Sequence, residues 1–215
     1  AGELTQAAVE SAGGTATTVI APMGAADYAS TAASVLSQDP DAVAMQGAGT
    51  DLVRVISALR QAGYDGIIVG NSSIVSADSL EALGEDGEGL LLSSRGLSAL
   101  DTENETIAEF GEQMRAENPD AVVDDLGLNS WMSVRLLAKV LDGREVTDGA
   151  SVIEALNAIE EPIEQDGVYP AYPGLSGSVP EEEYPRVAVF EAIANTIENG
   201  EVVSDGDFFN PLEVR

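Results

Sequence analysis

The sequence predicts an α/β fold in which a parallel sheet is flanked by helices. Short apolar runs alternate with amphipathic stretches from residue 1 to residue 95, and this alternation is typical of an α/β layer. Residues 42–73 contain one complete strand–helix–strand unit, which requires parallel strands and a right-handed crossover. The chain has 215 residues and a hydrophobic content of 44%, so it can bury a core.

The strand–helix–strand unit is the best-defined part of the pattern. Residues 42–45 are an apolar run, and residues 67–69 (Ile-Ile-Val) are a second one. Between them, apolar residues recur at the spacing of a helix with one buried face. This stripe consists of Leu52, Val55, Ile56 and Leu59. Gly63 suits the end of that helix, because glycine adopts the left-handed conformation readily.

Both predicted strands of this unit end in turns of small polar residues. In open parallel sheets, ligands sit beyond the carboxyl ends of the strands, so residues 46–50 and 71–73 are expected on one rim. We expect that rim to be a binding surface. The candidate binding residues there are Gln46, Gly47, Ala48, Gly49, Thr50, Asn71, Ser72 and Ser73.

The remainder of residues 1–96 fits the same alternation. Helices are predicted over 3–12 and 27–37, and Ser76 is a plausible N-cap for a short helix that ends at Leu83-Gly84. Strands are predicted over 15–21, which are β-branched, and over 89–93. Because the chain opens on a helix, its first strand–helix unit lacks a strand, and we expect a C-terminal portion of a longer protein.

The pattern changes after residue 96. Three amphipathic helices are predicted over 103–117 (capped by Asp101 or Thr102), 126–141 and 149–159, with no good strand among them. Their expected buried faces comprise Ile107, Phe110 and Met114; Leu128, Trp131, Val134 (or Leu137) and Leu141; and Val152, Ile153, Leu156 and Ile159. Residues 161–186 are rich in Pro, Gly and Tyr and are expected to be irregular. Residues 186–193 and 201–203 flank Asn199-Gly200, a strong hairpin signal.

The charge of the chain excludes several partners. Its formal net charge is 9 − 38 = −29, with Lys139 as the single lysine. An acidic surface repels phosphate backbones and anionic lipid, so nucleic-acid and membrane-surface partners are not expected. No apolar run is long enough to span a membrane, and residues 1–10 do not form a signal peptide. Either adaptation to high salt or a generally acidic, lysine-poor proteome would explain this net charge.

The sequence gives little support for an enzymatic function. The chain has no cysteine and no histidine, which removes thiolate and imidazole metal ligands and the commonest general base. A serine nucleophile would lack a base, and carboxylate pairs are expected by chance at this acid content. Gly47-Ala48-Gly49 resembles a dinucleotide turn, but Leu52 stands at the third glycine position. We therefore expect no catalytic residues, no cofactor and no metal.

The order of these segments resembles the type I solute-binding proteins of ABC importers, the branched-chain amino acid binding family. The matching stretches are AAVESAGG, TTVIAPMGAADYASTAASVLSQDPDAVAMQGAG, LRQAGYDGIIVGNSS, LEALGEDGEGLLLSS, LGLNSWMSVRLLAKVL, YPAYPGLSG and the closing Asn-Gly hairpin. Each stretch is loose, while their order and spacing together are fairly specific across nearly the whole chain.

The resemblance implies a two-lobe protein that traps its ligand as the lobes close on a hinge. Residues 1–96 would form most of the second lobe without its first strand. Residues 97–185 would be a helical return to the first lobe, which is incomplete here, and residues 186–215 a hairpin back in the second. The implied partners are a small-molecule ligand and the membrane permease of an ABC importer. The implied location is extracellular or periplasmic, with a lipid anchor supplied by a segment absent from this chain.

The resemblance also carries over site positions. The family's ligand-contacting turn falls on Gln46 to Thr50, and the turn that holds an acid for an amino-acid ammonium falls on Asn71-Ser72-Ser73, where no acid stands. Val123 and Asp124 match a further ligand-contacting place, and Leu128 replaces the family's tyrosine. Burying an unpaired ammonium is costly, so a plain amino acid is disfavoured unless Asp124 or a missing residue supplies the charge.

The resulting prediction is a non-catalytic binder of a small polar organic solute of the amino acid, amide or aromatic acid type. A ligand-sensing domain of a regulator or receptor would share the fold and is the alternative. A carboxylate-dependent hydrolase is the third hypothesis, and it predicts turnover that single Asp or Glu substitutions abolish.

Overall fold

The chain divides into two compact units, which are described separately. The computed structural model describes residues 2–47, 50–72, 75–174, 189–204 and 206–211. Within these, unit 1 comprises residues 2–94 and 194–204, and unit 2 comprises residues 95–193 and 206–211. The candidate residues Ala48, Gly49 and Ser73 lie outside the described residues.

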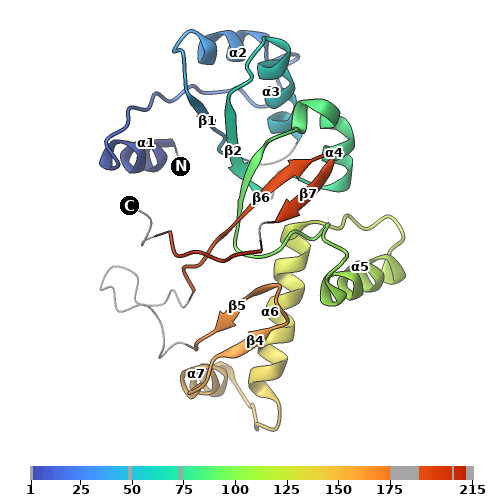
Figure 1. Ribbon diagram of the computed structural model, residues 1–215. Coiled ribbons are helices and arrows are strands. Elements are labelled where there is room, and N and C mark those ends of the chain that lie inside the picture. The colour runs from blue at the N-terminus through green and yellow to red at the C-terminus, as the bar shows by residue number, and fades with distance from the viewer. Residues whose placement is uncertain (1, 48–49, 73–74, 175–188, 205, 212–215) are drawn as a thin grey trace. The chain divides into compact units, whose positions relative to one another are not determined.

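Unit 1 is built on a five-stranded mixed sheet with the order β1-β2-β3-β6-β7 (Figure 1). Its strands are β1 (Ala42–Ala44), β2 (Ile67–Asn71), β3 (Leu91–Ser94), β6 (Ile193–Glu198) and β7 (Glu201–Ser204). The pairs β1–β2 and β2–β3 are parallel, whereas β6–β7 is antiparallel. The predicted parallel α/β layer is therefore confirmed, and the closing hairpin extends it.

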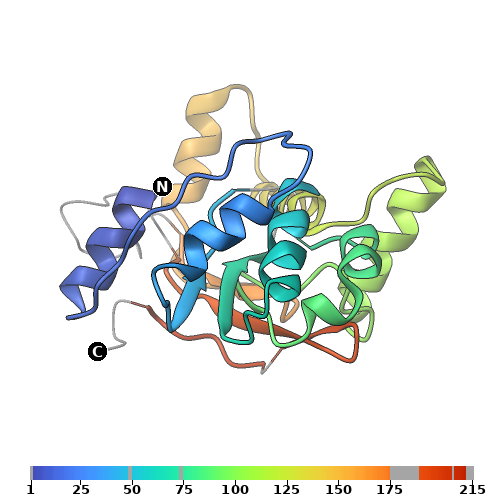
Figure 2. The ribbon, with the colours of Figure 1, turned by 90° about the horizontal axis from the view of Figure 1, so that it is seen from above.

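Helices α2, α3 and α4 lie side by side on one face of this sheet (Figures 1 and 2). The helices of unit 1 are α1 (Gly2–Ser11), α2 (Ala29–Leu36), α3 (Thr50–Gln61), α4 (Ala77–Leu83) and the short 3-10 helix η2 (Gly84–Gly87). The predicted stripe of α3 is buried, together with Val53. Each such side chain contributes about 1.5–3 kcal/mol when it leaves water, so α3 anchors the unit.

The strand predicted over residues 15–21 does not form. No strand is assigned to this segment. Among the described residues, no backbone hydrogen bond joins it to β1. The β-branched composition favours an extended backbone, while a strand also needs a partner with which to pair its N–H and C=O groups. The composition of residues 15–21 therefore favours a strand, but the described structure gives this segment no strand with which to pair.

The closing hairpin forms where the Asn-Gly signal predicts it, but its first strand is shifted. That strand is β6, which begins at Ile193, so residues 189–192 precede it. Residues 186–188 of the predicted strand lie outside the described residues. Asn199 and Gly200 have φ values of 55° and 77°, as a two-residue turn with two left-handed positions requires. The Glu88 carboxylate accepts hydrogen bonds from both turn amides, at 3.0 Å and 2.8 Å, and this fixes the turn to the loop before β3.

Unit 2 contains three helices and a small hairpin. Its helices are α5 (Glu105–Glu117), α6 (Asp125–Leu141) and α7 (Gly149–Asn157). One core cluster joins α5 to α6 around Ile107, Phe110, Leu128, Met132, Ala99 and Val168, and a second joins α6 to α7 around Val140, Ala155 and Ile159. The N-cap of α5 is Asn104, not the predicted Asp101 or Thr102. The Asn104 side-chain oxygen accepts hydrogen bonds from the Thr106 and Ile107 backbone amides.

The buried face of α6 differs from the predicted one. The structure buries Leu128, Met132 and Val140, whereas the predicted Val134 is 68% exposed. Trp131 is only half-buried, against Phe110, and its indole N–H donates to Gln113 at 3.0 Å. Apolar residues occur on several faces of this helix, so periodicity alone could not choose between spacings of three and four.

Residues 161–172 are more regular than predicted. They form an antiparallel hairpin of β4 (Ile163–Gln165) and β5 (Tyr169–Tyr172). Asp166 and Gly167 make its turn with φ values of 57° and 73°, and Asp-Gly is a strong hairpin signal by the same chemistry as Asn-Gly. Strand β5 was not predicted, because Pro170 argues against a strand in the sequence. Within the described part of the chain, no helix is long and apolar enough to cross a membrane.

Candidate functional site

The register of β1 and β2 brings the two predicted binding loops to one rim. Ala44 pairs with Val69, and the Met45 N–H donates to the Val69 carbonyl at 2.7 Å. Strand β1 ends at Ala44 and β2 ends at Asn71, so Gln46 and Asn71 both lie at the carboxyl ends of neighbouring parallel strands. For the described residues of these loops, the prediction that they share the carboxyl-end rim of the sheet is confirmed. Their role in binding remains a proposal.

The first rim loop leads from β1 into α3. Gln46 and Gly47 are exposed, and so is Thr50, the first residue of α3. Gly47 has a φ of 136°, a conformation that glycine adopts without penalty and that residues with a Cβ rarely reach. The small residue is therefore required by the turn itself, and it also leaves the backbone accessible at the rim.

The second rim loop leads from β2 toward α4. Asn71 is exposed, whereas the Ser72 residue is only 7% exposed and its carbonyl accepts from the Val75 N–H at 3.0 Å. Ser76 forms a capping box with Ser79 at the start of α4, which satisfies amides at that helix end. Asn71, the last residue of β2, is thus an exposed amide at the rim, and hydrogen bonds at Val75 and Ser76 anchor the described residues that follow.

A third loop at this rim was not predicted from the sequence. The Asp51 carboxylate accepts from the Gly24 N–H at 2.8 Å, and the Arg54 guanidinium donates to the Ala26 carbonyl at 2.6 Å. These contacts hold residues 22–28 against the first turn of α3. The Gly24 amide, the Tyr28 hydroxyl and Arg54 lower the pKa of Asp51 below its ordinary value. The partners are 27 and 28 residues apart, and no local sequence pattern signals such a contact.

Val123 and Asp124, the remaining candidates, lie in unit 2. Asp124 is the N-cap of α6, and its carboxylate accepts from the Gly127 N–H at 2.8 Å. Val123 packs against the cluster that joins α5 to α6. Both residues therefore have clear structural roles in their own unit, where acids favour helix N-termini.

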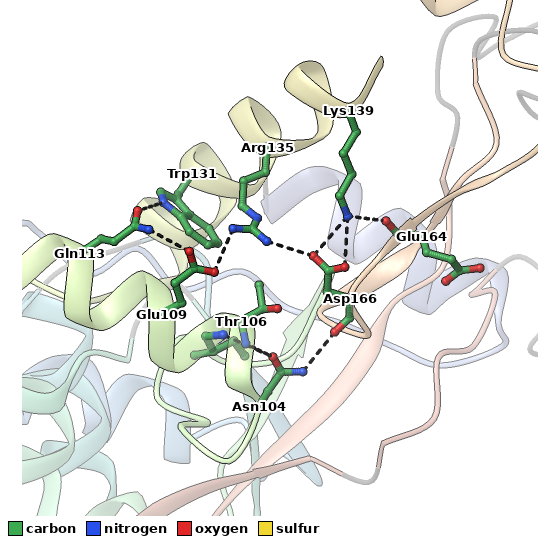
Figure 3. A network of polar contacts seen from close by, with 10 residues as sticks. Asn104, Thr106, Glu109, Gln113, Trp131, Arg135, Lys139, Glu164 and Asp166 are labelled. Carbon is green, nitrogen blue, oxygen red and sulfur yellow. Dashed lines mark hydrogen bonds and ion pairs between the residues drawn. The ribbon is translucent and has the colours of Figure 1, made fainter. Parts of the chain in front are cut away.

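Unit 2 also holds a network of charges across α5, α6 and the β4–β5 turn (Figure 3). Lys139 contacts Asp166 at 3.1 Å and the Glu164 carbonyl at 3.0 Å. Arg135 bridges Glu109 at 2.9 Å and Asp166 at 3.4 Å, and its guanidinium lies 4.5 Å from the centre of the Trp131 ring. The two cations are held by carboxylates, so the network secures the hairpin to the helices.

The chemistry available at the rim is hydrogen bonding. It offers the amide side chains of Gln46 and Asn71, the Thr50 hydroxyl and an accessible glycine backbone. Two carboxylates are described there: that of Asp51 is engaged by Gly24 and Arg54, and that of Asp27 accepts from the Ala29 N–H at 3.2 Å. No group of three or more potential metal ligands occurs in the described residues. Such a surface can orient a polar solute, and it lacks a paired nucleophile and base.

The sequence model of the family described as "Periplasmic binding protein" matches residues 1–172. That match covers both units through the end of β5. No curated protein sequence matches this chain.

Solved structures with the same fold are substrate-binding proteins. One is an ABC transporter substrate-binding protein from Aeropyrum pernix, with a TM-score of 0.67 and 19% identity over 86% of this chain and 49% of its own. A leucine-binding protein from Thermotoga maritima has a TM-score of 0.67 and 18% identity over 95% and 55%. A fatty acid ABC transporter substrate-binding protein from Thermomonospora curvata has a TM-score of 0.68 and 16% identity over 89% and 48%. The present chain therefore spans about half the length of these structures.

Proposed function

This chain belongs to the periplasmic binding protein family, and we propose that it forms part of a solute-binding protein that supplies an ABC importer. The solute is a small polar organic molecule. The observation that supports the proposal is the parallel pairing of the neighbouring strands β1 and β2, whose carboxyl ends lead into the two candidate loops. Ligands of open parallel sheets sit at such rims.

The loops are suited to a ligand held by hydrogen bonds. Gln46, Gly47, Ala48, Gly49 and Thr50 would contact it from the first loop. Asn71, Ser72 and Ser73 would contact it from the second, and Val123 and Asp124 would add contacts from unit 2. A micromolar dissociation constant needs about −8 kcal/mol, which a few directed hydrogen bonds and an apolar wall can supply.

The second rim loop disfavours a plain amino acid, because no acid stands at Asn71-Ser72-Ser73. In the described part of the rim, the Asp51 carboxylate already accepts from Gly24, and Asp124 already caps α6. A ligand ammonium would be costly to bury unless Asp124 or a residue outside this chain pairs with it. The related structures are titled for ligands as different as leucine and a fatty acid, so the fold accommodates more than amino acids.

The remaining parts of the proposal follow from family membership. The partner would be the membrane permease of an ABC importer. The location would be extracellular or periplasmic, with a lipid anchor supplied by another part of the protein. The protein would bind its solute and release it unchanged.

The test is calorimetry of the full-length protein with leucine, butyramide, benzoate and octanoate as probes. For the probe that binds, Gln46→Ala should weaken the affinity about tenfold, because it removes a polar contact worth about 1–1.5 kcal/mol. Gln61→Ala is the matched control: this exposed glutamine is the last residue of α3, at the end of the helix away from Thr50. Its loss should leave the affinity within about twofold.

Two results would contradict the proposal. One is an absence of heat with every probe from a protein that unfolds cooperatively. The other is an equal loss of affinity in Gln46→Ala and Gln61→Ala, since it would place the ligand away from the rim.

A further inference from the structure

The turn of the closing hairpin is held by the Glu88 carboxylate. The last residue pair of β6 and β7 is Glu198 with Glu201, and Asn199 and Gly200 form the turn between these two strands (Figure 1). One oxygen of Glu88 accepts from the Asn199 N–H at 3.0 Å, and the other accepts from the Gly200 N–H at 2.8 Å. Both amide hydrogens of the turn are therefore bound to one anion.

An Asn-Gly pair contains both the nucleophile and the electrophile of a cyclisation. The backbone nitrogen of Gly200 can attack Cγ, the carbonyl carbon of the Asn199 side chain. A bond forms between this nitrogen and Cγ, and the Cγ–Nδ2 bond breaks. Ammonia leaves with the side-chain amino group and the proton of the attacking nitrogen. The product is a succinimide ring, which water opens to aspartate or isoaspartate. Glycine hinders this attack least, because it has no Cβ.

The electrophile of this pair is accessible, whereas its nucleophile is engaged. Asn199 is exposed, and no partner for its side-chain amide occurs in the described part of the chain. The Gly200 nitrogen must leave its hydrogen bond to Glu88 before it can turn toward Cγ, and hydrogen bonds to a charged group are about twice as strong as neutral ones. The carboxylate also opposes loss of the amide proton, since a neighbouring negative charge disfavours a second anion.

We propose that Asn199 is a site of spontaneous deamidation and that Glu88 protects it. While the carboxylate holds both turn amides, the Gly200 nitrogen keeps its proton and stays away from Cγ. The reaction proceeds when this contact opens. Glu88 lies 111 and 112 residues from the two amides that it binds, so the protection exists only in the folded chain.

Deamidation weakens the hairpin in two ways. Isoaspartate carries the main chain through Cβ and Cγ of residue 199, which lengthens the turn by one methylene group and disturbs the pairing of Glu198 with Glu201. Both products also place a new carboxylate beside that of Glu88, and like charges repel. The turn then loses its attachment to the loop before β3.

The test is the rate of deamidation of the full-length protein at neutral pH. Peptide mapping by mass spectrometry follows the conversion of residue 199 to aspartate and isoaspartate. The folded protein should react at least about tenfold more slowly than the same protein in denaturing urea, where the Glu88 contact is absent. Glu88→Ala should raise the rate in the folded protein about fivefold or more, because it removes both the hydrogen bonds and the charge.

Glu85→Ala is the matched control. Glu85 is an exposed acid in η2, three residues before Glu88, so this substitution changes the net charge equally and leaves the turn amides bound. Its rate should stay within about twofold of that of the unchanged protein. If circular dichroism shows that Glu88→Ala alters the fold, Glu88→Gln replaces it with the same expected direction, because glutamine keeps the shape of the side chain and removes its charge.

Four outcomes would overturn the proposal. Equal rates in the folded and the urea-denatured protein would mean that the fold gives no protection. An unchanged rate in the Glu88 variant would assign the protection to the backbone of the turn alone. A slower rate in that variant would make the carboxylate a base that assists the attack. Equal acceleration by Glu85→Ala would assign the effect to net charge.

Discussion

At the scale of single residues, the rim depends on a glycine conformation and on one carboxylate. Gly47 takes a φ of 136° where β1 ends, and Asp51 joins α3 to the loop at residues 22–28 through Gly24. Neither residue lies in a large apolar contact. A glycine-specific backbone conformation and directed hydrogen bonds therefore set the shape of the loops that we propose to bind solute.

We expect Gly47→Ala to destabilise the protein by about 1–2 kcal/mol, because alanine is strained at this φ. A Cβ at this position would lie 3.7 Å from Leu52 Cδ1, an ordinary contact, so the cost is conformational. Urea unfolding followed by circular dichroism measures it. Gly149→Ala is the control, since a Cβ there meets nothing within 4 Å; an equal loss in both variants would refute the strain argument.

Asp51→Asn should reduce the dependence of stability on acid pH. The Gly24 amide, the Tyr28 hydroxyl and Arg54 lower the pKa of Asp51 from its ordinary value of 3.8. A lowered pKa in the folded state adds stability above the ordinary pKa, and that stability is lost as the pH falls through the folded pKa. Unfolding free energies measured from pH 6 to pH 2 should therefore fall less steeply in the variant. An unchanged slope would show that the carboxylate is not coupled to folding.

These two residues also show where sequence reasoning stops. Gly47 could be identified from the sequence, because a small-residue turn after an apolar run has a local signature. The contact of Asp51 with Gly24 could not, since it joins residues 27 positions apart and an acid early in a helix has a sufficient local explanation in the helix dipole.

At the scale of elements, the strand–helix–strand unit was predictable and two other elements were not. Residues 42–73 carry a 3.6-residue stripe between two apolar runs, and the structure forms β1, α3 and β2 there. The predicted buried face of α6 was wrong. This helix packs on α5 and α7 through residues spaced four apart, and its sequence has apolar residues on several faces, so the spacing could not be chosen. Segment 15–21 has strand composition without a strand, since pairing depends on a partner that its own residues cannot supply.

We expect Asp166→Asn to cost about 0.5–1.5 kcal/mol and to lose most of that effect in 1 M NaCl. Asp166 holds Lys139 at 3.1 Å and Arg135 at 3.4 Å, and its φ of 57° is one that asparagine tolerates well. The change therefore removes charge without adding backbone strain. Urea unfolding of both proteins at low salt and in 1 M NaCl measures this change in the free energy of unfolding.

Asp142→Asn is the matched control for that measurement. Asp142 is an exposed acid at the C-cap of α6, where the helix dipole disfavours negative charge. Its loss should be neutral or slightly stabilising. A salt-independent cost at Asp166 would mean that packing of the β4–β5 turn, rather than charge, holds the hairpin.

At the scale of the whole molecule, the net charge of −29 dominates behaviour in solution. Repulsion among carboxylates opposes the compact state, and the nine basic residues are too few to offset it. The ion pairs among the described residues involve cations on α3 and α6. Mobile cations must supply the remaining compensation, so stability should depend on ionic strength.

Raising NaCl from 0.1 M to 2 M at pH 7 should raise the melting temperature by about 5 °C or more, because the screening length falls well below the spacing of surface carboxylates. The same increase at pH 4, close to the isoelectric point of about 4.1, should have a smaller effect. Calorimetric melting at both pH values measures the difference. Equal salt effects at the two pH values would contradict the repulsion argument.

The central claim is that the two loops at the carboxyl ends of β1 and β2 hold a solute. The most direct test is a crystal structure of the full-length protein with the probe that binds most tightly in calorimetry. The account predicts hydrogen bonds from that molecule to residues within 46–50 and 71–73. A bound molecule that contacts neither loop would contradict it.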